Sequence, residues 1–549
     1  MSQITRRNLV KLTGASALSA LLGSSLIGCG SSGEATSASS SAGEAASQVV
    51  VTMTPGSEPA AGFDPLVAWG CGEHVHEPLI QSTLISTDAD LAFVNDLATS
   101  YVCSEDGLTW TFRVRDDVTF TDGMPLTAED VAFTINGIIS SDASEADLSS
   151  VAEAVVVDPS VVELRMKQPN NALLYTLAVV GIVPAHAYDS DYGANPIGSG
   201  RYMLEQWDKG QQVILKANPD YYGDKPQIER VVVLFMEEDA SMAAARAGEV
   251  DVAYTSASLA DNVPAGYTLL SCHSVDSRGI SLPCVGADAS DREEGGAMYK
   301  VGNDVTCDIA VRRALNYGID RDRMIGNVLN GHGTVAWSVG EGLPWGSPDM
   351  KVDVDPDYAR GLLDEAGWVV ADDGVRVKDG VRAAFDLYYS AGDSVRQALA
   401  SDFADQSGEL GIEVTVKGAS WDDIYPHQYC DPVLWGWGSN APVELYELTH
   451  SEGWGNYACY GDPAIDANLE AARAQASVED SYAFYRRAQW DAESGTGVAP
   501  QGASTWVWLA NVDHLYFERE GLKIAEQKPH PHGHGWSLVN NVDRWSWER

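Results

Sequence analysis

Residues 384–416, AFDLYYSAGDSVRQALASDFADQSGELGIEVTV, contain the pattern that decides the fold class. Runs rich in apolar, aromatic and β-branched residues at 384–389 and 412–416 predict two strands, and the stretch 394–407 between them predicts a helix. Two strands joined through a helix by short connections form a right-handed crossover with parallel strands. The sequence therefore predicts an α/β fold.

Further strand and helix patterns lie on both sides of this unit. The residues that start or end helices are the capping-box pattern at 127–130, the pair Asp355-Pro356, Gly367, and Gly248 after the stretch 239–247. Strand patterns occur at 49–54, 109–120, 161–167, 212–216 and 230–235. About 500 residues follow the N-terminal segment, which at roughly 100–200 residues per domain predicts two or three domains.

The N-terminal 48 residues have the composition of an export signal and a tether. Paired arginines, Arg6 and Arg7, precede a short apolar core and resemble the twin-arginine class of signals. The run 26–29, LIGC, resembles a bacterial lipobox, which implies that residues 1–29 are a signal and that Cys29 is lipid-modified. Residues 30–48 predict a flexible tether. We therefore expect an extracytoplasmic protein, lipid-anchored to the outer face of the cell membrane.

The charge balance excludes one class of partner. The formal net charge is -44, from 79 acidic and 35 basic residues, and such a chain repels the phosphates of nucleic acids and anionic lipid surfaces. We expect no nucleic-acid partner and no membrane contact apart from the lipid anchor. The acidic surface is typical of a soluble exported protein.

Cysteine and histidine residues supply the candidate metal ligands. Besides Cys29 there are seven cysteines, and the pairs that we expect first as disulfides are Cys272 with Cys284 and Cys430 with Cys459. Three histidines alternate with Pro531 and Gly533 near the C-terminus, a spacing that predicts an irregular loop able to reach a metal. Two more histidines lie two residues apart in the segment 69–78. The candidate metal ligands are His530, His532, His534, His74 and His76.

Six ordered segments resemble those of the family 5 solute-binding proteins, which serve ABC importers of peptides and nickel. One difference is Arg201, where the family commonly has proline. The segments are 106–115 (DGLTWTFRVR), 118–131 (VTFTDGMPLTAEDV), 196–200 (PIGSG), 218–223 (NPDYYG), 247–251 (AGEVD) and 311–320 (VRRALNYGID).

This resemblance implies a two-lobed periplasmic-binding-protein-like fold of type II, similar to cluster C, with the ligand cleft between the lobes. It implies a monomer that closes on its ligand and presents the closed form to the permease and ATPase subunits of an ABC importer. No catalytic cofactor is expected. The implied division is a discontinuous lobe I at 49–90, 195–285 and 500–549, an extra domain at 91–194, and lobe II at 286–499.

The segment 435–446, WGWGSNAPVELY, and the tail 528–536, KPHPHGHGW, are similar to nickel-uptake members of the family. They imply that the transported ligand is nickel, or another transition metal, held by a small chelator such as histidine. The histidine tail is expected to close onto His74 or His76. A chelate also needs flat walls and a cation for its carboxylates, for which the candidates are Trp69, Trp435, Trp437, Asn440, Arg278 and Arg396.

Two other functions fit parts of the sequence. A di- or oligopeptide-binding protein of the same family would need no histidine tail. A zinc-dependent hydrolase would also use clustered histidines, but the chain has no HExxH, GxSxG or P-loop motif. An enzyme is therefore not expected.

Overall fold

The computed structural model describes residues 47–548 except 69, 72, 73, 142 and 534. The predicted signal, the predicted lipidation site Cys29, Trp69 and His534 lie outside the described residues. In the part of the chain that is described, no helix has both the length and the apolar character needed to cross a membrane.

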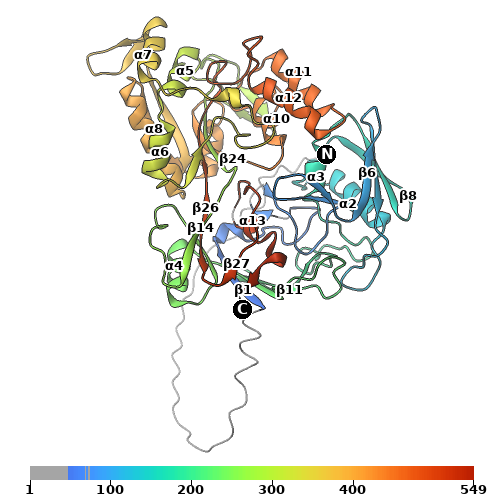
Figure 1. The fold of residues 1–549 in the computed structure, drawn as a ribbon. Coiled ribbons are helices and arrows are strands. Elements are labelled where there is room, and N and C mark those ends of the chain that lie inside the picture. Colours follow the sequence, from blue (N-terminus) through green and yellow to red (C-terminus); the bar gives the residue numbers. More distant parts are fainter. Residues whose placement is uncertain (1–46, 69, 72–73, 142, 534, 549) are drawn as a thin grey trace, which may run out of the picture.

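One half of the molecule is built on a seven-stranded sheet, and we call this half the first lobe (Figure 1). Its central strand β1 pairs in parallel with β12 and β13, and its side chains Val49, Val51 and Met53 are buried in the core. Helix α4 (Glu238–Ala247) packs beside the sheet and ends at Gly248, whose φ of 71° is the left-handed conformation that glycine favours. In spatial order the strands are β10 (Tyr202–Asp208), β11 (Gln212–Ala217), β12 (Arg230–Phe235), β1 (Gln48–Met53), β13 (Val252–Thr255), β26 (His514–Arg519) and β14 (Tyr267–Cys272).

The second lobe is built on a six-stranded sheet that contains the predicted crossover. Strands β22 and β23 pair in parallel from Ala384↔Glu413 to Ser390↔Ala419, and helix α8 (Ser394–Glu409) connects them, as the sequence predicts. Leu387, Leu399 and Phe403 are fully buried between this helix and the sheet. In spatial order the strands are β18 (Gly333–Val335), β25 (Trp506–Val512), β15 (Ser277–Ser281), β24 (Val433–Trp437), β22 (Ala384–Ser390) and β23 (Glu413–Ala419).

A third region carries an antiparallel four-stranded sheet with strands β6 (Ala98–Cys103), β7 (Thr109–Val114), β9 (Val161–Met166) and β8 (Val151–Asp158). Helix α2 (Ala128–Ile139) begins with the predicted capping box between Thr127 and Asp130. The predicted strand 109–120 is too long, because it ends at Val114. Val118 and Phe120 lie in the loop after β7, but their side chains are buried. Their alternation with exposed residues therefore resembles the pattern of a strand.

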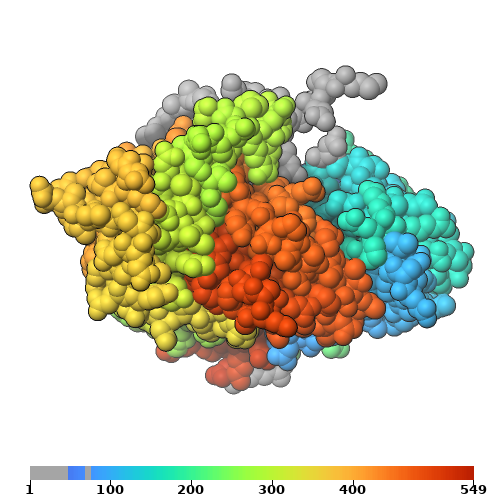
Figure 2. All heavy atoms as spheres, turned by 90° about the horizontal axis from the view of Figure 1, so that it is seen from above, coloured from blue at the N-terminus to red at the C-terminus, as the bar shows by residue number. Residues whose placement is uncertain are grey.

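This third region packs against the helices of the second lobe. Figure 2 shows the orange segment, which contains α11 (Pro463–Arg473) and α12 (Val478–Gln489), beside the blue and cyan region. The Asn171 side chain donates hydrogen bonds to the carbonyl oxygens of Ala472, Gln475 and Ser477. The region is therefore fixed to the second lobe through the loop between these two helices.

The remaining elements are short helices and hairpins around these three sheets. The α-helices are α3 (Leu173–Leu177), α5 (Ile309–Gly318), α6 (Arg321–Val328), α7 (Pro356–Glu365), α9 (Trp421–Ile424), α10 (Val443–Thr449) and α13 (Trp536–Val539). The 3-10 helices are η2 (Pro55–Ser57), η3 (Pro348–Met350), η4 (Tyr425–His427) and η5 (Val542–Arg544). The short strands are β2 (Gly70–Cys71), β3 (His74–Val75), β4 (Ile85–Thr87), β5 (Phe93–Asn95), β16 (Arg292–Glu294), β17 (Ala297–Tyr299), β19 (Val369–Val370), β20 (Arg376–Lys378), β21 (Val381–Arg382), β27 (Leu522–Lys523) and β28 (Ser546–Trp547).

The chain passes between the two large sheets at 273–276, between β14 and β15, and at Asp513, between β25 and β26. The two crossings lie side by side, because the Val512 amide donates to the Asp276 carbonyl at 2.9 Å and the Ser274 hydroxyl donates to the Val512 carbonyl at 2.6 Å. Strands β15 and β25 thus belong to the second sheet. The lobe limits at 285 and 500 remain predictions, and the chain changes sheet at 273–276 and at Asp513.

The two predicted disulfides are wrong. All six cysteines whose side chains are described, Cys103, Cys272, Cys284, Cys307, Cys430 and Cys459, are free thiols. Cys272 ends β14 in the first sheet, whereas Cys284 follows β15 in the second, and the Cys430 thiol donates to the Asp431 carboxylate. Sequence spacing gave no information on these positions.

Candidate functional site

A cavity of about 1030 Å³ lies between the lobes. The second lobe lines it with the start of α8, the segment around α9, the end of β24, the loop that follows and α10. The first lobe contributes His76 and the tail segment 528–532, and the third region contributes residues near the end of α2 and α3. The cavity is thus formed by segments that are far apart in the sequence.

Stacked aromatic rings form one wall of the cavity. The Trp435 ring lies parallel to Tyr457, with centroids 4.3 Å apart, and to Trp421, with centroids 5.5 Å apart. Trp437 lies at a tilt beside Trp454, with centroids 5.5 Å apart. Trp435 and Trp437 line the cavity, and their role as ligand walls remains a prediction. Flat rings of this kind bind planar or apolar groups.

Arg396 supplies a positive charge to this wall. Its guanidinium carbon lies 5.4 Å from the centre of the Trp421 ring, and Nη1 donates to Asp393 at 3.0 Å. Burial, with the neighbouring charge of Arg278, lowers the pKa of Arg396 to about 10, so the side chain stays cationic at neutral pH. Its Nε is buried and has no hydrogen-bond partner among the described residues, and therefore remains to be satisfied by an anion.

Three side chains converge on Gly436 of β24. A methyl group at this position would lie 2.4 Å from Nη2 of Arg396, 2.7 Å from Cε1 of His532 and 3.0 Å from Nη1 of Arg278. Only glycine leaves space for this approach, since a backbone hydrogen replaces the side chain. Gly436 was not among the predicted site residues, although a glycine between two tryptophans of a buried strand is a signal of close approach.

Asp276 holds His532 and Arg278 in place. Its carboxylate accepts hydrogen bonds from Nδ1 of His532 at 2.5 Å, from Nε2 of His514 at 3.2 Å and from the Arg278 guanidinium. Burial alone would raise the pKa of Asp276, but Arg278 and His532 outweigh it and hold the pKa well below its usual range. A carboxylate on Nδ1 fixes the ring and directs Nε2 of His532 to the other side. Arg278 is therefore an ion-pair partner of Asp276 and does not line the cavity.

His530 is fully buried beside the same network. Its Nδ1 lies 3.1 Å from Nδ1 of His514, and its Nε2 lies 3.2 Å from Oε1 of Gln527. Burial, His514 and His76 keep the pKa of His530 well below its usual value, so the ring is neutral. A metal at His530 would replace one of these two contacts. Its role as a ligand remains a prediction, and sequence reasoning missed both Asp276 and His514.

His76 lies against the tail, as the sequence analysis expects. A methyl group on Gly533 would come within 2.7 Å of Cε1 of His76, and Nδ1 of His76 lies 3.4 Å from the Ser537 hydroxyl. His74 is in β3, but its side chain lies outside the described residues. The structure therefore brings one of the two predicted N-terminal histidines to the tail.

Asn440 links the tail to the second lobe. Its Nδ2 donates to the Pro529 carbonyl at 2.9 Å, and the amide of His532 donates to the Gly438 carbonyl at 2.6 Å. Oδ1 of Asn440 is buried without a partner among the described residues, and Asn440 lines the cavity. These contacts connect the lobes across the cleft.

Glu444, in the first turn of α10, places an acid at the cavity. Burial, with the negative charge of Asp276, raises the pKa of Glu444 to about 8, so the carboxyl is mostly protonated at neutral pH. Its Oε2 is buried and has no hydrogen-bond partner in the described part of the chain. A cationic group bound nearby would favour the ionised form.

Comparison with known proteins gives a consistent result. The model of the bacterial extracellular solute-binding proteins, family 5 Middle, matches residues 92–456. Protein XP55 of Streptomyces lividans is 32% identical over 493 residues, which cover 86% of this chain and 85% of the relative. The nickel-binding periplasmic protein of Escherichia coli is 26% identical over 64% of this chain and 68% of its own length. The oligopeptide-binding protein AppA of Bacillus subtilis is 27% identical over 72% and 76%.

Two solved structures are similar over 91% of this chain and 99% of their own length. NikZ from Campylobacter jejuni in complex with Ni(L-His) has a TM-score of 0.74 at 26% identity. AppA from Bacillus subtilis in complex with a nonapeptide has a TM-score of 0.68 at 22% identity, which shows a shared fold alone.

Proposed function

Because this chain belongs to the family 5 bacterial extracellular solute-binding proteins, and is therefore an extracytoplasmic solute-binding protein and not an enzyme, we propose that its cleft captures a transition metal as a small carboxylate-bearing chelate. Nickel bound to a carboxylate-bearing chelator such as histidine fits the site best. The protein would deliver this complex to the permease and ATPase subunits of an ABC transporter.

The observation that carries this proposal is the pairing of Arg396 with His532 on Gly436. A buried guanidinium with an unsatisfied Nε suits a carboxylate, and an imidazole oriented by Asp276 suits a metal ion. Both groups lie at one point of the cleft, beside the stacked Trp435 and Trp421 rings. A chelate presents a carboxylate and a metal close together, which these neighbouring groups match.

Closure of the two lobes would bury this ligand. Removal of water strengthens both the ion pair with Arg396 and the bond from His532. The tail is part of the closed wall through Asn440 and Pro529. His76, His530, His534 and His74 are proposed as further ligands or supports, with Trp69 as a further wall, while Arg278 is proposed to support His532.

Titration calorimetry tests the proposal with three ligands: Ni²⁺ with L-histidine, Ni²⁺ alone, and a pool of dipeptides. We expect tight binding of the nickel–histidine mixture only. Arg396→Gln should weaken it by roughly 10- to 100-fold, since a charge-assisted hydrogen bond contributes about 1.5–3 kcal/mol. Arg323→Gln, on the surface of α6 with its ion pair to Glu409, is the matched control and should have no effect.

A peptide ligand is the second candidate, because AppA of Bacillus subtilis is an oligopeptide-binding protein with 27% identity. The same cleft groups could bind a peptide carboxylate at Arg396 and an amine at Glu444. Tight binding of dipeptides with no response to nickel would overturn the metal proposal in favour of this one.

We also propose that Cys29 is lipid-modified and that the mature chain is a monomer. Labelling with a palmitate analogue in the native host tests the first point. A Cys29→Ala chain should be unlabelled and released from the membrane fraction.

A further inference from the structure

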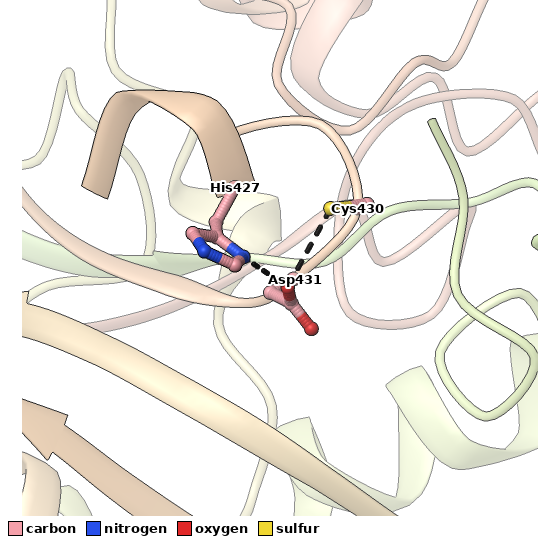
Figure 3. Close-up of side chains that lie close together, drawn as sticks. All are labelled: His427, Cys430 and Asp431. Atoms are coloured by element: carbon pink, nitrogen blue, oxygen red, sulfur yellow. Dashed lines mark hydrogen bonds and ion pairs between the residues drawn. The ribbon is translucent and has the colours of Figure 1, made fainter. Parts of the chain in front are cut away.

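Outside the cavity, three potential metal ligands converge at the turn after η4 (Figure 3). These are His427, Cys430 and Asp431, which we call the turn cluster. One ligand atom from each residue lies within 4.8 Å of the other two. None of the three lines the cleft, although Gln428 and Tyr429 between them do.

The backbone holds the turn cluster in this arrangement. The amides of Cys430 and Asp431 both donate to the carbonyl of His427, at 3.0 Å and 2.9 Å, and so close a tight turn. The side chain of Asn303 donates to the Cys430 carbonyl at 3.2 Å and fixes the turn from outside. The three side chains consequently point to one place, as Figure 3 shows.

The His427 ring is also fixed. It stacks on the ring of Tyr388 with centroids 4.3 Å apart and an interplanar angle of 21°. Tyr388 belongs to β22, and its amide donates to the Pro432 carbonyl at 3.0 Å, directly after the cluster. A ring that is held in one orientation loses little entropy when it binds a metal.

Hydrogen bonds join the atoms that would bind a metal. Oδ2 of Asp431 accepts from Nδ1 of His427 at 2.8 Å and from Sγ of Cys430 at 3.5 Å. Burial and the Asp431 charge raise the pKa of Cys430 to about 12, so the sulfur carries a proton that a metal would displace. The side chains of His427 and Asp431 are 37% and 24% exposed, which leaves a path from solvent.

We propose that Nδ1 of His427, Sγ of Cys430 and the Asp431 carboxylate form a second metal site, for a borderline divalent cation such as zinc. Nitrogen, sulfur and carboxylate oxygen are the ligands that zinc takes, with a fourth position left for water. The hard ions magnesium and calcium prefer oxygen alone, so this set of ligands disfavours them. The proposal does not depend on the ligand of the cleft.

Cobalt titration of the reduced mature chain tests this site. Co²⁺ replaces zinc in such sites, and a bond from cobalt to a thiolate gives a charge-transfer absorption band that histidine and carboxylate ligands do not give. We expect this band to reach its maximum at one equivalent of Co²⁺ and to be lost when Zn²⁺ is added. No band in the parent chain would overturn the proposal.

Substitutions assign the ligands. Cys430→Ser should abolish the band, and His427→Gln and Asp431→Asn should each weaken Co²⁺ binding by more than roughly tenfold, as loss of even an outer partner costs 10- to 100-fold. Cys459→Ser and the cleft variant His532→Gln are matched controls that should keep it. A band that survives Cys430→Ser, or is lost in Cys459→Ser, would contradict the assignment. The partly exposed ion pair between His427 and Asp431 contributes little to stability. Circular dichroism should therefore show that the substituted chains are folded.

Discussion

The tail at 528–536 and the turn at 427–431 both contain histidines, but they use them differently. In the tail, both rings are buried. His530 contacts His514 and Gln527, and His532 contacts Asp276. In the turn, His427 is partly exposed and faces the same point as a thiol and a carboxylate. Both segments hold their imidazoles with hydrogen bonds, but the tail offers them to a ligand enclosed in the cleft, whereas the turn offers one beside a thiol and a carboxylate at the surface.

The largest expected difference is in the loss of stability when the carboxylate that contacts each histidine is removed. Asp276→Ala should lower the free energy of unfolding by about 3–5 kcal/mol, because it leaves the buried Arg278 charge uncompensated. Asp431→Ala removes a partly exposed pair with His427 and should cost at most about 1 kcal/mol. Urea denaturation measures both variants, and equal losses would contradict the distinction.

A smaller effect is expected where the tail meets the second lobe. Gly436→Ala places a methyl group against Arg396 and His532, and should destabilise the protein by about 1–3 kcal/mol while abolishing binding of nickel–histidine. Gly361→Ala is the control, because nothing lies within 4 Å of its added methyl group in helix α7. It should be neutral or stabilise the helix by up to about 1 kcal/mol. Unchanged calorimetric binding in Gly436→Ala would show that the convergence on this glycine is unimportant.

The pH dependence of stability should reveal Glu444. Its pKa is raised from 4.5 to about 8, so the folded protein holds a proton that the unfolded chain has released between these values. The free energy of unfolding should therefore fall as the pH rises towards 8, by at most about 1.4 kcal/mol per pH unit. Glu444→Gln should remove this slope between pH 6.5 and 8, which lies above the usual pKa of histidine. A slope that persists in urea titrations of the variant would assign it to other groups.

The smallest effect is expected from reduction. Because the six described cysteines are thiols, a reductant should leave the free energy of unfolding unchanged, and each should be alkylated without prior reduction. Peptide mapping by mass spectrometry measures this. A disulfide at Cys430 would remove a ligand of the turn cluster, and its loss on reduction would typically cost 2–5 kcal/mol.

Local patterns predicted local structure well. The crossover at 384–416 and the capping box before α2 are confirmed, because adjacent residues determine them. The family and the two-lobed fold followed from six ordered segments, and the family model and the solved structures confirm them. The approach of His76 to the tail followed from placing both chain ends in one lobe.

Contacts between distant segments could not be predicted in the same way. Asp276 and His514 have no motif, and only the crossing of the two sheets brings them to His532. The turn cluster is an exception, because His427 lies only three residues before Cys430 and four before Asp431, and this short spacing was not used in the prediction. Glu444 looks like an ordinary helix residue until its burial is known. The clustering of histidines in the sequence predicted a metal site, but it could not show which imidazoles lie close together in the fold.

The paired crossings at 273–276 and Asp513 also determine how the molecule can bend. The two crossings are joined by hydrogen bonds, so we expect them to move as one hinge when the lobes open. The tail joins this hinge as a third segment. The His530 amide donates to the His273 carbonyl at 2.9 Å, and the His530 carbonyl accepts from the Val275 amide at 2.8 Å. The tail that supplies imidazoles to the cleft is therefore also hydrogen-bonded to the hinge, and we expect changes in the tail to alter how the lobes open.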